Sequence, residues 1–435
     1  MPNNEASKST ILQEREIPAP PYYPFYGLRE LISEKYGLFN VEQKMMNVSD
    51  ARAAITRIGE HLPDDWLELS NLASAYYVLG YVDKALELYE QVLKKERNVS
   101  TLLNAAVIYE TYGWFKEALE LSREANHLDP KDPYAGVLYA NDLLRLGRWA
   151  EAWPSYVHYC ANFDWLRSTL PEWRGVAESI RGKKLLVLDE GGFGDNIFFF
   201  RWMPLLKELG AHITLKCPVG FASLVEDYPF IDDVVGGGPY GTTVEVFPGK
   251  YDLFTSILDL GLHFGITLEN YYWTGPYIHT DKRKFRYSHR TVPRIGLCWK
   301  SGENVSPRKH RSLTAEQVCR IADSVAYGKC EWTSLTYDEL PPVDMNIPQL
   351  GDWSDTATIL SGCDLVISTD TGVAHLAGAM GIPTWVMLPG ISAWQFLLGC
   401  DRHPLYPSMR MFRNVGEGID NAVDLLCQSL KRRIS

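Results

Sequence analysis

The pattern of apolar and polar positions changes near residue 166. Before that point, small and apolar residues recur at a long, regular interval. After it, short apolar runs alternate with segments that read as helices. The first pattern is typical of stacked helices, and the second is typical of strands that alternate with helices in a parallel sheet. We therefore expect a helical part followed by an α/β part.

Three glycines mark the helical part. Gly80, Gly113 and Gly147 are spaced 33 and 34 residues apart. An alanine precedes each glycine by seven residues and another follows it by five: Ala73, Ala106, Ala140, Ala85, Ala118 and Ala152. Small residues let two helices cross closely, and glycine accepts the backbone conformation of a tight turn. The period resembles the tetratricopeptide repeat, a helical solenoid whose groove binds proteins. The alternative is that the repeats only pack on the next domain.

These changes of pattern divide the chain into four segments. We expect a leader at 1–50, tetratricopeptide-like repeats at 51–165, a first Rossmann-like domain at 166–288 and a second at 289–435. The leader turns rich in proline and tyrosine after its polar start. It is expected either to pack in extended form on a neighbouring domain or to be a mobile tail.

The α/β part contains two runs of predicted elements. In the first run we expect strands at 184–189, 212–216, 233–235 and 252–258, with helices at 196–209 and 220–227. In the second run we expect strands at 294–299, 332–336, 365–368 and 384–388, with helices at 314–325, 355–362, 372–380 and 419–432. Parallel strands bind ligands at their carboxyl ends. Two such runs predict two Rossmann-like domains that face each other across a cleft.

Composition narrows the classes of function. The chain of 435 residues is 46% hydrophobic and 22% charged, which is enough apolar material for stable cores. A net charge of −11 argues against a surface that coats nucleic acid. The eight cysteines have no zinc-site spacing and are expected to be reduced thiols. With no apolar signal segment and no run of membrane-spanning length, we expect a cytoplasmic protein.

A glycine-rich turn, Glu190-Gly-Gly-Phe-Gly-Asp195, follows the first predicted strand. Gly192 and Gly194 would let the backbone approach a ligand, and the helix behind them would favour an anion. The turn lacks the spacing of a dinucleotide or P-loop motif. Asp195 stands at the helix start, where it has two interpretations: a helix N-cap or a catalytic carboxylate.

A second turn joins the strand at 365–368 to a helix through Asp370, Thr371 and Gly372. The Thr371 hydroxyl and the first amides of the helix are suited to a diphosphate. Asp370 has the alternative role of an N-cap. His375 lies one turn into the helix, where it is either a structural hydrogen-bonding residue or a catalytic one.

A third, basic segment follows the strand at 294–299. It contains Lys300, Lys309 and Arg311 within an acidic chain. Its position at the carboxyl end of a strand would suit a leaving phosphate. The alternative is a charged surface exposed to water.

Together these motifs resemble the heptosyltransferase-like glycosyltransferases that carry N-terminal tetratricopeptide repeats and have the two-Rossmann-domain GT-B architecture. A more remote resemblance is to the repeat-bearing O-GlcNAc transferase. The resemblance covers residues 60–430 and rests on PEWRG (171–175), EGGFGDNIFFFRWMPLLKELGA (190–211), IGLCWKSG (295–302), KHRSL (309–313), SLT (334–336), the segment 355–389 and YPSMRMFR (406–413). Ser392-Ala393-Trp394 departs from the common form of the family.

The resemblance implies a nucleotide-diphosphate sugar as donor, transfer with inversion, and neither a metal nor another cofactor. It implies that Asp195 is the base that deprotonates a hydroxyl on a protein or glycan acceptor. The implied donor-binding residues are Gly192, Gly194, Lys300, Lys309, Arg311, Ser334, Asp370, Thr371, Gly372 and His375. No Asp-x-Asp pair, the usual metal-holding motif of other glycosyltransferases, is present.

Two other functions compete with an active transferase. One is a non-catalytic repeat scaffold with a degenerate transferase half, which predicts the loss of Asp195 or of the basic segment, and both are present. The other is a nucleotide-sugar epimerase of similar architecture, which the repeats and the YPSMRMFR ending do not favour.

Overall fold

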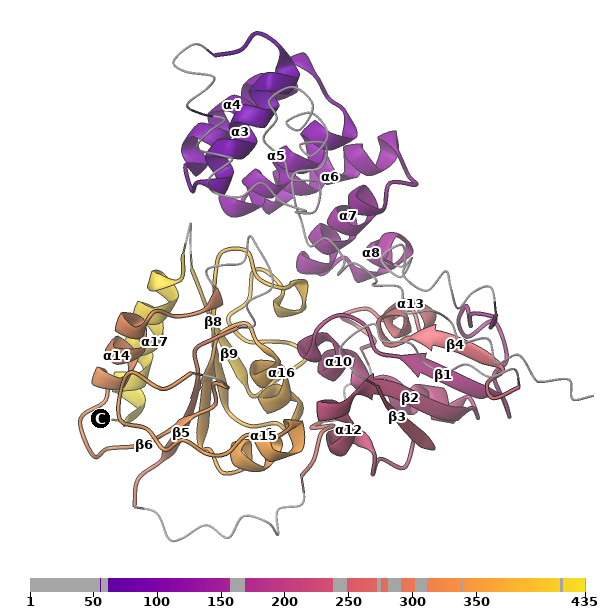
Figure 1. The fold of residues 1–435 in the computed structure, drawn as a ribbon, viewed down its shortest axis with the longest axis vertical. Coiled ribbons are helices and arrows are strands. Elements are labelled where there is room, and N and C mark those ends of the chain that lie inside the picture. The colour runs from indigo at the N-terminus through magenta and orange to yellow at the C-terminus, as the bar shows by residue number, and fades with distance from the viewer. Residues whose placement is uncertain are drawn as a thin grey trace, which may run out of the picture.

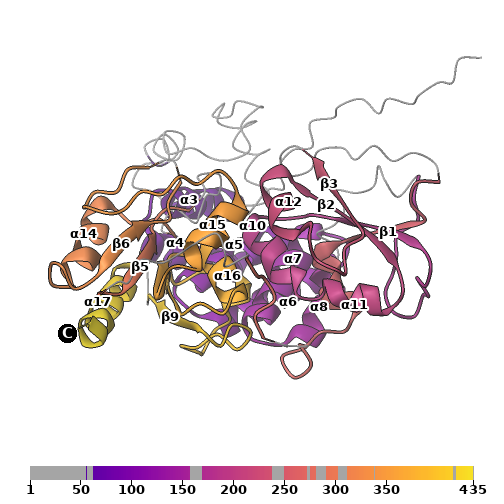
Figure 2. The same ribbon diagram turned by 90° about the horizontal axis from the view of Figure 1, so that it is seen from below.

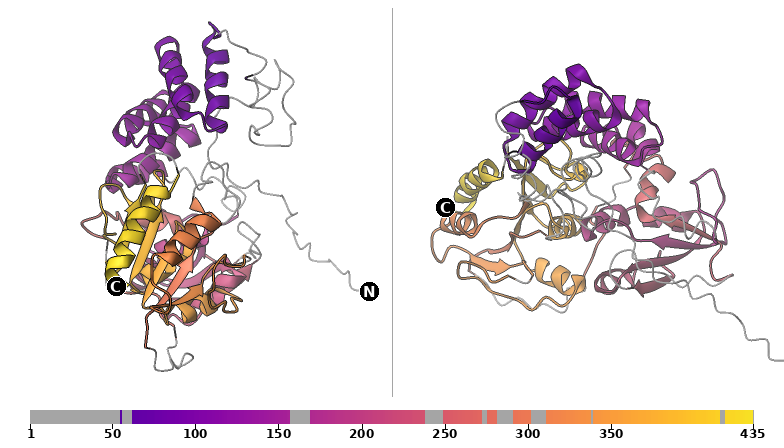
Figure 3. Two further views of the ribbon diagram at one scale, coloured as in Figure 1. Left: turned by 90° about the vertical axis from the view of Figure 1, so that its left-hand side faces the viewer. Right: turned by 45° about the horizontal axis from the view of Figure 1, so that its top comes forward.

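The computed structural model describes residue 55 and residues 62–156, 169–237, 249–271, 275–280, 291–301, 311–337, 339–414 and 418–434. The predicted leader and the candidate ligand Lys309 lie outside these residues. A layer of helices lies over two α/β units that stand side by side (Figures 1 and 3). Within the described residues, no helix combines the length and the apolar character that crossing a bilayer requires.

The helices of this layer pair into hairpins. They are α3 (Trp66–Val78) with α4 (Val82–Lys95), α5 (Val99–Thr111) with α6 (Phe115–Leu128), and α7 (Pro133–Arg145) with α8 (Trp149–Tyr156). Gly80, Gly113 and Gly147 lie in the three turns with φ of +83°, +77° and +77°, a conformation that glycine adopts without strain. All six alanines of the repeat are fully buried. The predicted helix pairs are confirmed.

The first helix of each hairpin begins at a polar N-cap, and these caps recur with the repeat. Asp65 and Asp132 each accept hydrogen bonds from two backbone N–H groups of their own first turn. Asn98 forms a capping box with Thr101. Each cap satisfies N–H groups that have no partner within the helix, which explains why these three helices begin where they do.

The last hairpin shares its hydrophobic core with the α/β units, whereas most of the first two hairpins form a separate core. Trp149 and Trp153 are buried in the shared core. The Trp153 indole donates a hydrogen bond of 2.6 Å to the carbonyl of Ile266. Its ring covers Gly261, where a Cβ would come within 2.7 Å of the ring. The hairpin α7–α8 is therefore built into the α/β part.

The first α/β unit is a parallel sheet in the order β3-β2-β1-β4. Its strands are β1 (Lys184–Leu188), β2 (His212–Pro218), β3 (Asp233–Gly237) and β4 (Leu253–Ser256), and its helices are α10 (Phe193–Phe200), α11 (Met203–Glu208), α12 (Val219–Val225) and α13 (Leu260–His263). The backbone of Pro171 and Trp173 pairs with Phe254, so the linker covers the outer edge of β4.

The second unit is a parallel sheet in the order β6-β5-β7-β8-β9. Its strands are β5 (Arg294–Cys298), β6 (Glu331–Ser334), β7 (Leu365–Ser368), β8 (Thr384–Leu388) and β9 (Met409–Arg413), and its helices are α14 (Ala315–Asp323), α15 (Trp353–Leu360), α16 (Gly372–Ala379) and α17 (Asp420–Ile434). The alternating α/β pattern in two runs is thereby confirmed.

Two predicted elements need correction, and one strand was not predicted. The helix expected at 196–209 is two helices, because Pro204 lacks an N–H and its ring excludes the carbonyl of Phe200, so α10 cannot continue through it. The strand expected at 252–258 ends at Ser256 and continues as a 3-10 turn, Ile257–Asp259. The edge strand β9 is not among the strands expected from the sequence.

Candidate functional site

Two helices that follow strands of different sheets begin next to one another. Figure 2 shows α10 and α16 between the two sheets. A Cβ at Gly194 would lie 2.8 Å from Cδ2 of His375, so glycine lets the first turn of α10 touch α16. The two units are thus in direct contact at this point. Because each helix N-terminus carries partial positive charge, their junction is suited to an anion.

Asp195 stands at this junction, in the first turn of α10. The N-cap is Gly192, so Asp195 is not the N-cap; it lies three residues into the helix and caps it from there. Its Oδ2 accepts a hydrogen bond of 2.8 Å from the N–H of Gly192. Its Oδ1 accepts one of 2.5 Å from Nε2 of Gln395, which belongs to the other α/β unit. The carboxylate therefore caps its own helix and also bridges the two units.

Asp370 and Arg311 lie beside the N-terminus of α16. The N-cap of α16 is Thr371, not Asp370. The Asp370 carboxylate accepts the N–H of Ala393 at 3.0 Å, and its Oδ1 lies 3.5 Å from the guanidinium of Arg311. Arg311 also lies 3.4 Å from the Asp370 carbonyl. The structure thus brings one predicted basic residue to the predicted anion site.

Thr371 and Gly372 open α16. The Thr371 side chain makes no capping bond to its own helix, and its Oγ1 lies 2.9 Å from Oγ of Ser368. A Cβ at Gly372 would come within 2.6 Å of the Trp353 ring, so the backbone needs glycine there. The hydroxyl of Thr371 is held at the carboxyl end of β7, where the sequence predicted it.

The other candidate donor ligands are placed differently. Lys300 forms an ion pair of 2.9 Å with Glu339, which also accepts the indole N–H of Trp299. Ser334 ends β6 and is buried, with its Oγ against the backbone of Thr336. In this structure both side chains have structural partners.

His375 is buried between the units. Burial lowers the pKa of His375 to about 4, so the ring is neutral near pH 7. Its Nδ1 lies 3.3 Å from the hydroxyl of Tyr406. A neutral, buried imidazole does not provide a positive charge for a diphosphate, and its contacts fit the structural interpretation.

Three residues that the sequence did not single out surround this junction. They are Gln395, Arg201 and Arg413. The Arg201 guanidinium stacks on Phe198 at the interface and donates to the hydroxyl of Tyr277 at 3.0 Å. Burial lowers the pKa of Arg413 to about 10, which leaves it charged at neutral pH. Arg413 lies within the quoted YPSMRMFR motif, but nothing in the local sequence marks Gln395.

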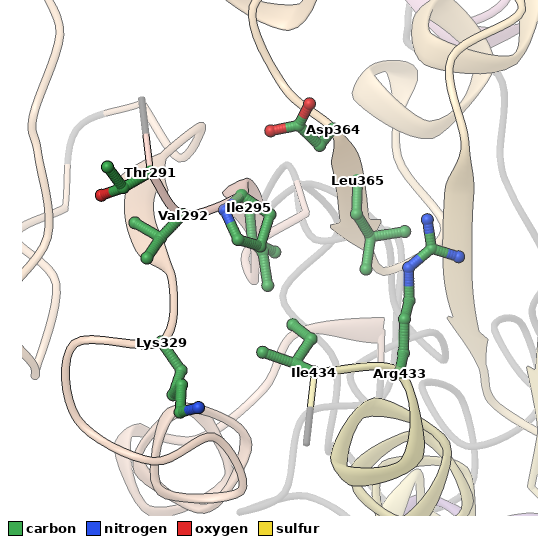
Figure 4. A pocket seen from close by; sticks show the side chains of 9 residues that line it. Thr291, Val292, Ile295, Lys329, Asp364, Leu365, Arg433 and Ile434 are labelled. Carbon is green, nitrogen blue, oxygen red and sulfur yellow. The ribbon is translucent and has the colours of Figure 1, made fainter. Parts of the chain in front are cut away.

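A cavity lies at the opposite end of the second sheet, away from the junction of α10 and α16. It has a volume of about 450 Å³ and is lined by residues around the amino ends of β5 and β7, including Ile295, Leu365 and Arg433 (Figure 4). Ligand sites of parallel sheets lie at the carboxyl ends. Among the described residues, no group of three or more His, Cys, Asp or Glu side chains is arranged to hold a metal ion.

No family model matches the chain. Protein FlbA of Caulobacter vibrioides is 26% identical over 314 residues, which cover 63% of this chain and 50% of FlbA. The chain thus spans about half the length of this curated relative.

Similar solved structures include the E. coli ADP-heptose LPS heptosyltransferase II, with 15% identity, a TM-score of 0.40 and coverage of 57% of this chain and 96% of that one. An O-GlcNAc transferase mutant of Thermobaculum terrenum has 10% identity and a TM-score of 0.29, with coverage of 89% and 88%. At these TM-scores, neither structural similarity is evidence for the activity of this chain. Both structures come from the two groups of transferases that the sequence motifs resemble.

Proposed function

We propose that this chain is a metal-independent glycosyltransferase that moves a sugar from a nucleotide-diphosphate sugar to a hydroxyl acceptor. The observation that carries the proposal is the meeting of α10 and α16. Asp195 stands on one side of their junction, and the N-terminus of α16 with Arg311 stands on the other. Sugar transfer needs this pair of functions, because the acceptor hydroxyl loses a proton while the departing diphosphate gains charge.

The donor diphosphate would bind at the N-terminus of α16. The first N–H groups of a helix have no acceptor within the helix, and the Thr371 hydroxyl lies at the same place. Arg311 would add a charge-assisted hydrogen bond. Protein groups would then meet the charge that a metal meets in other transferases. Lys309 and Lys300 remain proposed ligands of the same diphosphate.

Asp195 would act as the base that takes the proton of the acceptor hydroxyl. A carboxylate can accept about four hydrogen bonds, so the bonds from Gly192 and Gln395 do not by themselves exclude a bond from the acceptor. A base directed at the sugar from the side opposite the diphosphate would invert the anomeric carbon. The acceptor, a protein or a glycan, would be recruited in part by the first two hairpins, which have their own core.

The purified chain is expected to bind a nucleoside diphosphate without added metal. Isothermal titration calorimetry with ADP, GDP and UDP, each with and without EDTA, measures this. Affinity for at least one nucleotide should be unchanged by the chelator, because the helix N-terminus and Arg311 supply the positive charge. Binding that EDTA abolishes would contradict metal independence, and the absence of binding to all three would contradict the donor site.

Arg311→Ala is expected to weaken binding of that nucleotide by tenfold or more. A hydrogen bond to a charged group contributes roughly 1.5–3 kcal/mol, and about 1.4 kcal/mol corresponds to tenfold. The matched control is Arg320→Ala, which removes the same charge from an ion pair between α14 and α17. Equal dissociation constants in both variants would show that Arg311 only holds Asp370.

A non-catalytic scaffold is the second candidate function. The observation that favours it is the use of the Asp195 carboxylate as a helix cap, which accounts for the residue without catalysis. If the chain is only a scaffold, Asp195→Asn should have no effect on turnover. The transferase predicts a large loss, and the size of that loss is derived in the Discussion.

A further inference from the structure

Gln395 is buried, with 2% of its surface exposed, and reaches across the interface to Asp195. Its Nε2 donates the hydrogen bond of 2.5 Å to Oδ1 of Asp195, which is 200 positions away in the chain. Its Oε1 is buried and accepts no hydrogen bond from the described residues. An amide oxygen cannot donate to a carboxylate, so the contact itself determines which end of the amide faces Asp195.

We propose that Gln395 is a positioning residue for Asp195: it orients the carboxylate and stabilises its charged form. The inference rests on the proposed role of Asp195 as base and extends it to a residue of the opposite α/β unit. An acceptor hydroxyl can lose its proton only to a carboxylate that is ionised and correctly directed. The N–H of Gln395 favours both conditions.

The turn that carries Gln395 is held from several sides. It is the 3-10 turn Trp394–Phe396. Arg413 donates to Oγ of Ser392 at 2.7 Å and to the carbonyl of Leu397 at 2.5 Å. Leu397 has φ of +48°, a conformation that costs energy in a non-glycine residue and persists only where surrounding contacts impose it. The position of the amide is thus imposed by contacts on both sides of the turn.

The donor side and the acceptor side of the junction share this turn. The N–H of Ala393, directly before it, is bound by the Asp370 carboxylate, which pairs with Arg311. Gln395, within it, binds Asp195. One short segment therefore connects the proposed diphosphate site with the proposed base.

The last helical hairpin also determines where the turn lies. The Trp394 ring packs edge-on against Trp149 and Trp153, with ring centroids 5.6 and 6.0 Å away. The N–H of Leu398 donates to the carbonyl of Arg145 at 2.9 Å. On its other side, Trp394 contacts Phe198 of α10 at 5.4 Å. The helical layer is therefore linked to Asp195 through a single continuous set of contacts.

The competing explanation is that Gln395 only fills the interface. The two explanations differ in how Asp195 titrates. If the amide stabilises the carboxylate, Gln395→Met, which has a similar size but no N–H, should raise the pH at which Asp195 is protonated by about one to two units. Gln395→Glu should raise it as well, because it places a like charge beside the carboxylate. A residue that only fills space would leave the titration unchanged in Gln395→Met.

The test is a carbon-13 NMR titration of the full-length protein labelled at the aspartate carboxyl carbons. The Asp195 signal is the one that Asp195→Asn removes. The matched control is Gln317→Met, because Gln317 donates a comparable bond of 3.0 Å to Asp420 on the far side of the second unit. That control should leave the Asp195 signal unchanged. If Gln395→Met does not fold, Gln395→Leu, which also lacks the N–H and adds no charge, provides the same comparison.

An unchanged titration of Asp195 in a folded Gln395→Met or Gln395→Leu variant would overturn the inference. The titration needs neither donor nor acceptor, so it is independent of the proposed function. A shifted titration in a protein that transfers no sugar would contradict the transferase and leave the Gln395–Asp195 coupling standing. In an active enzyme, the acidic limb of the pH profile of kcat should shift with the titration, while the dissociation constant of the donor stays the same.

Discussion

Asp195→Asn is expected to lower turnover by about 10²–10⁴-fold, the usual contribution of general-base catalysis. In this structure, asparagine at position 195 can retain the contacts that the aspartate side chain makes. Its side-chain oxygen can still accept the N–H of Gly192, so the capping of α10 is preserved. Its amide would face Nε2 of Gln395, and a rotation of the Gln395 amide would bring the buried Oε1 into that contact as an acceptor. The substitution therefore removes the basic carboxylate with little other change.

The measurement is turnover, with the melting temperature and the donor dissociation constant taken on the same sample. The last two should match the wild-type values. A variant that is folded, binds the donor normally and turns over at a near wild-type rate would exclude Asp195 as the base. The scaffold would then be the better interpretation of the capping contact, or the base would be another acid of the junction.

Trp153→Ala is expected to destabilise the whole chain by about 3–5 kcal/mol, the usual cost of removing a large buried aromatic side chain. Trp153 lies in the core shared by α8 and the α/β units, and it packs on Gly261, Trp149 and Trp394. The substitution also leaves the carbonyl of Ile266 without the indole N–H. The effect is measured as a lower midpoint of urea denaturation, followed by circular dichroism.

The matched control is Trp114→Ala in the turn of the second hairpin, where the side chain is 40% exposed. It should cost about 1 kcal/mol or less, as substitutions near the surface usually do. Trp153→Phe retains most of the packing and should fall between the two. If Trp153→Ala and Trp114→Ala shifted the midpoint equally, the last hairpin would not be part of the α/β core.

This shared core changes how acceptor recruitment by the repeats can be tested. A chain that begins near residue 167 would lack Trp149 and Trp153 and would expose the ring of Trp394, which orders the turn that carries Gln395. Loss of activity in such a fragment would therefore not demonstrate an acceptor site. Surface substitutions on the first two hairpins within the full chain are the suitable experiment, with the acceptor KM as the readout.

Local regularities in the sequence were sufficient for much of the fold. The helix pairs follow from the spacing of Gly80, Gly113 and Gly147, because a positive φ at a turn and the close crossing of helices are requirements that nearby residues meet by themselves. The strands at 365–368 and 384–388 have the predicted bounds, because short apolar runs next to turn residues are a local signal. The break at Pro204 was missed, because one helix was predicted over 196–209, although the missing N–H of proline is a local signal for such a break.

Sequence also predicted correctly that two candidate residues come soon after strands. Asp195 and Thr371 each follow a strand, and parallel strands carry the residues after them to one edge of their sheet. Their exact capping positions were different from those expected. Gly192 and Thr371 are the N-caps, because the backbone leaves the helical conformation at those residues and not at the neighbouring aspartates.

Only the tertiary structure determined what these residues contact. Gln395 and Asp195 are 200 positions apart, and neither spacing nor periodicity indicates that they meet. Their contact depends on how α10 packs against the second unit and on how α8 supports Trp394. Local sequence determines which side of a helix or strand is buried, since that depends on neighbours a few residues away. Which other element covers that side depends on how whole helices and strands pack together. In this protein that packing lets Asp195 bridge the two α/β units as well as cap its own helix.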